Sequence, residues 1–226
     1  MLKTLIVVPM KTLSVSKTRL ASSLSNSARI RLVRLLYQKT LNFLIPIAAK
    51  EQVEIAVVTK CKYAKDIAKK LGVRIIHEPS NLGLSGAILH SAIAAKEMGF
   101  ERLCIIPADL AAPLKSDLTA MLKSDSAVTI CPSSDFGTNA LVVSPPDIIP
   151  FRYGSRSSLS HLQEAKKKGI NARIMELDSF TFDIDTNKCL ARAVRVVPDI
   201  AGVCALSKMF LCLPFPPYQI FVLRMI

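Results

Sequence analysis

RLCIIPADL, residues 102–110, is an apolar segment that runs into an aspartate, Asp109. Consecutive apolar residues are typical of a β-strand that is covered on both faces. A carboxylate directly after such a strand is unfavourable unless it is paired or bound to a cation. We therefore interpret Asp109 either as a ligand of Mg²⁺, which prefers oxygen atoms, or as the N-cap of the following helix.

Similar apolar segments alternate with helical ones along the chain. The predicted strands are residues 2–9, 53–59, 73–77, 102–110, 127–131, 140–144 and 172–177. The predicted helices cover residues 30–44, with Ser27 as a candidate cap, then 63–71, 87–98, 113–122 and 157–168, and a last one from Thr186. This order predicts an α/β fold with a mostly parallel central sheet flanked by helices. Ligands of such sheets bind at the carboxyl ends of the strands, which here precede the loops after Pro9, His77, Ile106 and Cys131.

The chain of 226 residues suits one such domain, which we place at residues 1–198. Residues 199–226 are a more apolar tail of unknown role, interrupted by Pro214, Pro216 and Pro217. The prolines argue against a membrane-spanning helix, so we expect a strand or an irregular segment there. Because a buried strand is predicted to begin as early as Leu5, we do not expect a removable leader.

The net charge of +13 predicts anionic partners, which include nucleotides, phosphorylated metabolites and nucleic acids. Nucleic acid is disfavoured because the chain has no tryptophan, only 6% aromatic residues and no zinc-finger or RNA-recognition motif. The six cysteines form no CxxC pair, which favours reduced, mostly buried thiols in a cytoplasmic protein.

A basic loop, PMKTLSVSKTRLA (residues 9–21), follows the first predicted strand and holds Lys11, Lys17 and Arg19. Backbone N–H groups and cations of this kind can hold a triphosphate, although the segment is not a Walker A loop. The alternative interpretation is an ordinary solvated surface loop.

FDIDT (residues 182–186) places two more acids, Asp183 and Asp185, before the last predicted helix. In an extended segment they point to opposite sides, so one is expected to complete a metal site and the other to cap the helix. The alternative interpretation is that Asp183 and Asp185 both serve as turn or cap residues. The three histidines are scattered, and we assign His161 to helix packing.

Two further segments, FGTNALVV (136–143) and FRYGSRSSLSHL (151–162), combine hydroxyl groups with a helix start. A helix N-terminus lined with serines is suited to binding an anion, and ordinary helix capping is the alternative.

The chain resembles the 2-phospho-L-lactate guanylyltransferase family in an ordered set of motifs. They are VPMK, SKTRLA, PADL, GTNAL, the spacing of Gly154, Ser157 and His161, and DIDT. That family includes phosphoenolpyruvate and 3-phosphoglycerate guanylyltransferases and serves the biosynthesis of coenzyme F-420. The resemblance, from about Leu5 to Leu190, implies a single-domain nucleotidyltransferase fold related to GT-A glycosyltransferases. It also implies that GTP and a small phosphorylated acid react with Mg²⁺ to give a guanylylated diphosphate and pyrophosphate.

The resemblance also implies roles for individual residues. The acceptor-binding residues fall on Thr138, Gly154 and Ser157. The metal ligands fall on Asp109 and on the DIDT motif, on Asp183 rather than Asp185. The nucleotide-binding cations fall on Lys11, Lys17 and Arg19, and the catalytic residues fall on Lys17, Arg19 and Asp109. The sequence departs from the family at Ser85, where an asparagine is usual among the nucleotide contacts, and in DTNKCL (185–190), which lacks the usual acids.

Other interpretations stay open at this point. A nucleotidyltransferase for a molybdopterin-type cofactor and a non-catalytic relative that only binds nucleotide fit part of the pattern. The sequence does not choose between phospholactate, phosphoenolpyruvate and phosphoglycerate as the acceptor. A homodimer is expected as one form of the protein, and no membrane span is expected.

Overall fold

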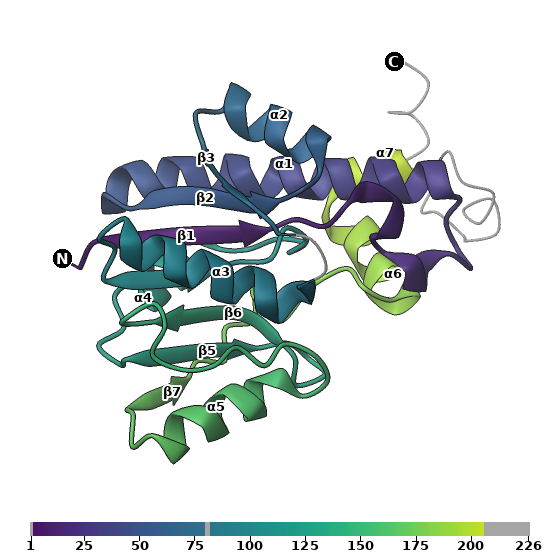
Figure 1. Ribbon diagram of the computed structural model, residues 1–226. Coiled ribbons are helices and arrows are strands. Elements are labelled where there is room, and N and C mark those ends of the chain that lie inside the picture. Colours follow the sequence, from purple (N-terminus) through teal and green to yellow (C-terminus); the bar gives the residue numbers. More distant parts are fainter. Residues whose placement is uncertain (1, 80–81, 206–226) are drawn as a thin grey trace. The chain divides into compact units, whose positions relative to one another are not determined.

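The fold is organised around a sheet whose strand order, among the described residues, is β3-β2-β1-β4-β6-β5-β7 (Figure 1). The structure is a computed structural model that describes residues 2–79 and 82–205. The strands are β1 (Thr4–Pro9), β2 (Glu54–Thr59), β3 (Arg74–His77), β4 (Arg102–Ile105), β5 (Val128–Pro132), β6 (Thr138–Val143) and β7 (Ala172–Ile174). The helices are α1 (Asn26–Glu51), α2 (Lys62–Lys70), α3 (Gly83–Glu97), α4 (Lys115–Leu122), α5 (Ser157–Lys167), α6 (Asn187–Val196) and α7 (Pro198–Ala205), with 3-10 turns η1 (Leu13–Val15) and η2 (Thr18–Leu20).

The strand directions confirm the predicted, mostly parallel sheet. β1 pairs in parallel with β2 and β4, β2 with β3, and β5 with β7. Only β6, among the described strands, is antiparallel to its neighbours β4 and β5. The loop of residues 133–137 between β5 and β6 is too short for a parallel crossover, so the chain must reverse there. The start of β6 therefore lies at the same sheet edge as the carboxyl ends of the parallel strands.

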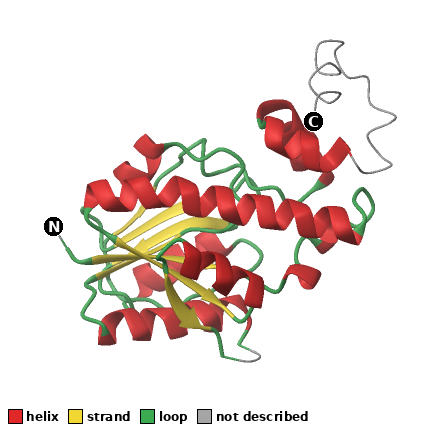
Figure 2. Cartoon of the chain, turned by 90° about the horizontal axis from the view of Figure 1, so that it is seen from above, coloured by secondary structure: helices red, strands yellow, loops and turns green. Residues whose placement is uncertain are grey.

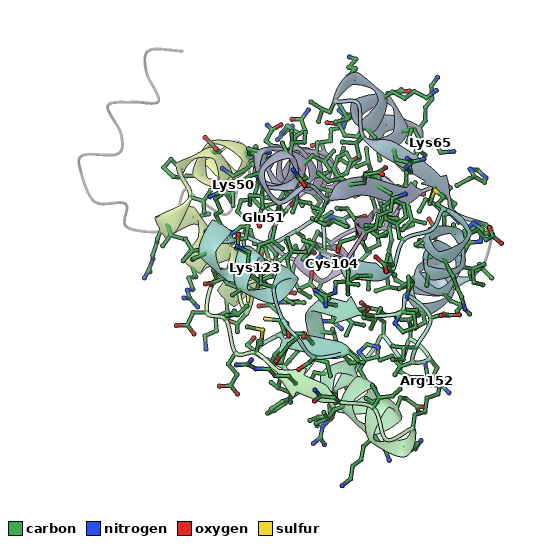
Figure 3. All side chains as sticks on the ribbon, turned by 90° about the vertical axis from the view of Figure 1, so that its left-hand side faces the viewer. Lys50, Glu51, Lys65, Cys104, Lys123 and Arg152 are labelled. Carbon is green, nitrogen blue, oxygen red and sulfur yellow. The ribbon has the colours of Figure 1, made fainter. Side chains whose placement is uncertain are left out.

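Helices cover both faces of the sheet, as the continuous apolar strands require (Figure 2). On β1, Leu5 and Val7 pack in one core with residues of α3 and α5, including Ile88 and Ala165. On the opposite face, the Tyr37 hydroxyl in α1 donates to a carbonyl of α2 at 2.9 Å. The end of α1 contacts α4 there as well, because Lys123 Nζ lies 3.6 Å from a carboxylate oxygen of Glu51 (Figure 3).

The chain divides into two compact units. The first comprises residues 1–12 and 36–183 and contains the whole sheet. The second comprises residues 13–35 and the segment from 184 onward, with η1, η2, the start of α1, and the packed helices α6 and α7. None of the helices within the described residues is long and apolar enough to cross a membrane.

Several predicted bounds and one predicted element type differ from the structure. The strand predicted over 102–110 ends at Ile105, because the chain turns at Ala108 and Asp109 after Pro107. Helix α3 begins at Gly83, inside a segment predicted as loop. The cap of α1 is Ser25, whose hydroxyl accepts from the backbone N–H of Ala28 at 3.2 Å, and not Ser27.

The expectation of a strand or irregular segment in the tail is wrong for its first residues, because α7 continues to Ala205. The prolines that argued against a membrane-spanning helix, Pro214, Pro216 and Pro217, lie outside the described residues. The division into a domain of residues 1–198 and a tail of 199–226 stays a prediction.

Candidate active site

Three of the predicted site residues lie at the same edge of the sheet. Lys11 follows β1, Asp109 follows β4, and Thr138 opens β6, where it pairs with Pro132 at the end of β5. Lys11 is exposed, whereas Asp109 and Thr138 are half-buried. The parallel strand directions produce this arrangement, because the loops that follow parallel strands leave the sheet on one side.

The chain segment before Asp183 lies directly against the loop that carries Asp109. Leu110 and Asp183 form an isolated antiparallel bridge, and the backbone N–H of Ala111 donates to the Phe182 carbonyl at 3.0 Å. Both aspartates are half-buried. Two carboxylates on adjoining segments fit Mg²⁺, which is usually held by one or two carboxylates, with water and phosphate oxygens as its other ligands.

Within the described residues, no group of three or more His, Cys, Asp and Glu side chains is arranged to hold a metal ion. The pair of Asp109 and Asp183 fits a metal that shares its coordination with a bound phosphate.

Asp185 has a different partner within the second compact unit. Its carboxylate lies 2.5 Å from Nζ of Lys17, whose side chain is only 5% exposed. Lys17 itself adopts a left-handed backbone conformation, with φ of 54°, at the start of η2. The prediction that Asp183 or Asp185 caps the following helix, α6, is wrong. The cap of α6 is Thr186, whose hydroxyl accepts from the Cys189 N–H at 3.3 Å.

The predicted acceptor-binding hydroxyls meet at the start of α5. Thr138 Oγ1 lies 2.9 Å from Ser157 Oγ, although the two residues are far apart in the sequence. Gly154, in the loop before the helix, has φ of 145°, a conformation that residues with a Cβ rarely adopt. Ser157 is 1% exposed and Gly154 is exposed, so the hydroxyl cluster lies beneath an open loop.

The turn between β5 and β6 is tied to the same helix start. The Phe136 carbonyl accepts from both the backbone N–H and the hydroxyl of Ser158, at 3.1 and 2.7 Å. This contact fixes the turn against the first residues of α5. It therefore holds Thr138, two residues later, next to Ser157.

His161, which the sequence analysis assigned to helix packing, is also a member of this cluster. Its side chain is completely buried, and its Nδ1 lies 3.1 Å from Thr138 Oγ1. Burial lowers the pKa of His161 to about 4, although the nearby Glu164 opposes the shift. The signal available in the sequence was its position four residues after Ser157, which places both on one face of a helix.

Ser85, in α3, contacts the loop that precedes α5. Its hydroxyl accepts from the backbone N–H of Tyr153 at 2.9 Å, directly before Gly154. The role in nucleotide binding that the resemblance implies for Ser85 stays a prediction. Arg19 is exposed on η2.

Two of the buried cysteines, Cys104 and Cys131, are poorly suited to act as nucleophiles. Cys61, Cys104 and Cys131 are buried and free, as predicted. Burial raises the pKa of the Cys104 thiol to about 12 and that of Cys131 to about 11, so neither supplies a thiolate at neutral pH. Figure 3 shows Cys104 in the interior of the sheet.

Comparison with known proteins gives a consistent result. Residues 4–194 match the family described as guanylyl transferase CofC like. The chain is 35% identical over 188 residues to a 3-phospho-D-glycerate guanylyltransferase of Colwellia psychrerythraea, covering 82% of this chain and 88% of the relative. It is 29% identical to a 2-phospho-L-lactate guanylyltransferase of Methanothermobacter thermautotrophicus, covering 82% and 81%. It is 30% identical to a phosphoenolpyruvate guanylyltransferase of Rubrobacter xylanophilus, covering 82% and 91%.

Among solved structures, the fold is similar to that of a candidate nucleotide-diphospho-sugar transferase from Desulfovibrio desulfuricans. The TM-score is 0.68 at 15% sequence identity, over 91% of this chain and 98% of that one. At this identity the similarity shows the fold alone. The predicted nucleotidyltransferase fold is thus confirmed.

Proposed function

The chain belongs to the CofC-like guanylyl transferase family, and from this premise we propose that it joins GMP from GTP to a small phosphorylated carboxylic acid. The three relatives are named for 3-phospho-D-glycerate, 2-phospho-L-lactate and phosphoenolpyruvate, and these acids are the candidate acceptors. All three carry a phosphate and a carboxylate. The resemblance to the family places the reaction in the biosynthesis of coenzyme F-420.

One observation carries the proposal: the hydroxyls of Thr138 and Ser157 meet, 2.9 Å apart, at the N-terminus of α5. Hydroxyl donors combined with the positive end of a helix dipole favour an anionic group, either a phosphate or a carboxylate. Gly154, in the loop just before the helix, adds no side chain that would obstruct an approaching ligand. This cluster lies at the same sheet edge as Lys11 and Asp109.

The proposed reaction is an in-line displacement at phosphorus. A phosphate oxygen of the acceptor forms a bond to the α-phosphorus of GTP, and the bond to the bridging oxygen breaks as pyrophosphate leaves with that electron pair. The acceptor phosphate is already ionised at neutral pH, so no general base is required. Attacking and leaving groups are both anionic, and cations therefore supply most of the stabilisation.

Mg²⁺ is the proposed metal, held by Asp109 and Asp183, and it would neutralise the charge of the phosphates when bound. Lys11, Lys17 and Arg19 are proposed to bind the triphosphate of GTP, with Ser85 as a further nucleotide contact. The ion pair of Lys17 with Asp185 supports a fixed position for this cation, because the side chain is almost completely buried. A cytoplasmic location and a homodimer stay predictions.

The test is an assay of pyrophosphate release with GTP, Mg²⁺ and each of the three acids in turn. We expect release with at least one acid, and none when Mg²⁺ is omitted. No release with any acid would sink the proposal. Pyrophosphate release with a molybdopterin-type acceptor, and with none of the three acids, would identify the alternative transferase. GTP binding without turnover of any acceptor would identify a non-catalytic relative.

Asp109→Asn removes one negative charge at nearly constant shape. Since loss of a group that acts on the transferred phosphate costs about 10²–10³-fold in kcat, we expect a decrease of at least that size. Asp125→Asn is the matched control, because Asp125 is exposed in the loop before β5, at the opposite end of the strands. Equal activity of the two variants would remove Asp109 from the metal site.

A further inference from the structure

His161 is held between two partners that define how its ring is used. The backbone N–H of Arg152 donates to Nε2 at 2.9 Å, and Nδ1 lies 3.1 Å from Thr138 Oγ1. The ring of Tyr153 packs against the imidazole in a T-shaped contact, with centroids 5.1 Å apart. The side chain is fully buried, so the ring cannot exchange these partners for water.

These contacts fix the protonation of the ring. A backbone N–H only donates, so Nε2 must offer its lone pair and carry no hydrogen. A neutral imidazole then carries its hydrogen on Nδ1 and donates it to Thr138 Oγ1. Burial favours the neutral form, in agreement with the lowered pKa of His161.

The cluster holds three hydrogens that can form hydrogen bonds. His161 Nδ1, Thr138 and Ser157 supply one hydrogen each, and the cluster itself uses one bond from His161 and one between the two hydroxyls. One hydroxyl hydrogen is therefore left for a ligand. Thr138 is half-buried whereas Ser157 is 1% exposed, which favours Thr138 as the residue that presents it. In that arrangement Thr138 Oγ1 accepts from both partners and only its O–H points outward.

We propose that His161 is a positioning residue that directs the Thr138 hydroxyl as a hydrogen-bond donor toward an anionic oxygen of the acceptor. This inference rests on the proposed function, because it takes Thr138 to contact the acceptor. With both lone pairs occupied, Thr138 offers the acceptor no hydrogen-bond acceptor of its own. The site then favours a carboxylate or phosphate oxygen over a hydroxyl donor at that position.

Two substitutions separate the two hydrogen bonds of the ring. In His161→Asn, the amide nitrogen takes the position of Nδ1 and can still donate to Thr138. In His161→Gln, the terminal amide reaches the position of Nε2, so its oxygen can accept from the Arg152 N–H while the donor to Thr138 is lost. A role in packing alone predicts similar kinetics for both variants.

We expect His161→Gln to raise the KM of the acceptor about tenfold, the effect of losing one directed hydrogen bond to a charged group, with the KM of GTP unchanged. His161→Asn should stay within about threefold of the wild type, because it keeps the donor to Thr138. In a Thr138→Val background, His161→Gln should have no further effect on the acceptor KM. Equal KM values for the Asn and Gln variants, or fully additive effects in the double variant, would overturn the proposal.

A spectroscopic test does not depend on turnover. Nitrogen-15 NMR of the full chain at neutral pH should show His161 as the neutral tautomer with its hydrogen on Nδ1. Adding 3-phospho-D-glycerate should move the Nδ1 resonance in the wild type and leave it in place in Thr138→Val. A hydrogen on Nε2, or no response to any of the three acids in a protein that turns one over, contradicts the positioning role. A protein that shows the expected tautomer but transfers GMP to none of them refutes only the proposed function.

Discussion

Asp183 and Asp185 are two residues apart and equally acidic, yet the structure gives them different surroundings. Asp183 lies in a backbone bridge with Leu110, beside Asp109, whereas the carboxylate of Asp185 is bound to Lys17. The sequence predicted that the two side chains point to opposite sides, which is a property of any extended segment. This local pattern could not assign the sides, because Leu110 and Lys17 are distant in the sequence from both aspartates, and only the resemblance to the family pointed to Asp183 as the metal ligand.

At the residue scale, we predict distinct effects of Asp183→Asn and Asp185→Asn. Asp183→Asn should raise the Mg²⁺ concentration needed for half-maximal activity and lower kcat by about 10²-fold, because the metal loses a ligand. Asp185→Asn should leave the Mg²⁺ dependence unchanged and alter the KM of GTP, because it acts on the position of Lys17. Titrations of Mg²⁺ and of GTP with each variant measure both effects. A shifted Mg²⁺ requirement in Asp185→Asn, with none in Asp183→Asn, would reverse the assignment.

The turn between β5 and β6 is the element that positions Thr138 beside Ser157 and His161. Ser133 N–H donates to the Gly137 carbonyl at 3.0 Å, and Phe136 adopts a left-handed conformation with φ of 63°. The Asp135 carboxylate accepts from the Gly137 N–H at 3.2 Å. A Cβ at Gly137 would lie 2.5 Å from Ser133 Oγ and 3.1 Å from Asp135 Oδ1, so this turn requires glycine for close packing.

At the element scale, Gly137→Ala should therefore destabilise the protein by about 1–3 kcal/mol, the usual effect of overpacking. It should also raise the KM of the acceptor, because Thr138 follows directly. Urea unfolding and the pyrophosphate assay measure the two effects. Ser133→Ala in the same chain removes the atom that the new methyl group meets, so the double variant should recover part of the stability.

Gly202→Ala is the matched control for this experiment. Gly202 lies in α7, and a Cβ there meets no atom within 4 Å. Because alanine favours a helix interior over glycine by about 1 kcal/mol, this variant should be neutral or more stable. A loss of stability in Gly202→Ala equal to that in Gly137→Ala would contradict the close-packing explanation.

The stability of the whole molecule is coupled to pH through His161. Its pKa is about 4 in the folded protein, against the ordinary value of 6.5. Between these values the unfolded chain binds a proton that the folded protein does not. The contribution of the neutral ring to the free energy of unfolding is therefore fully present above about pH 6.5. It is lost as the pH falls through this window toward about pH 4.

At the scale of the whole molecule, we predict that wild-type stability falls more steeply below neutral pH than that of His161→Gln. The shift from 6.5 to about 4 corresponds to roughly 3 kcal/mol in full, of which roughly 2 kcal/mol should be lost between pH 7 and pH 5. Urea unfolding of both proteins at the two pH values isolates this contribution, because other groups titrate alike in both. Parallel curves would contradict a buried neutral His161.

The sequence by itself determined the α/β class, the mostly parallel sheet, and the loops that carry Lys11, Asp109 and Thr138. These features follow from local patterns, because continuous apolar strands alternating with helices have few ways to bury their side chains. The ordered motifs also indicated the family. The sequence did not determine the type of the segment that became α7, since its apolar character suits a helix as well as a strand.

The tertiary structure alone decided which side chains meet. The partners of Asp183 and Asp185, the contact of Ser85 with Tyr153 N–H, and the burial of His161 between β6 and its own helix are long-range contacts. The partners in these contacts are at least 23 residues apart in the sequence, and local periodicity carries no information about such pairs. The segment RLCIIPADL placed Asp109 after a strand. The bridge between Leu110 and Asp183, which brings a second aspartate beside Asp109, depends on how the last part of the first unit folds back onto the loop after β4.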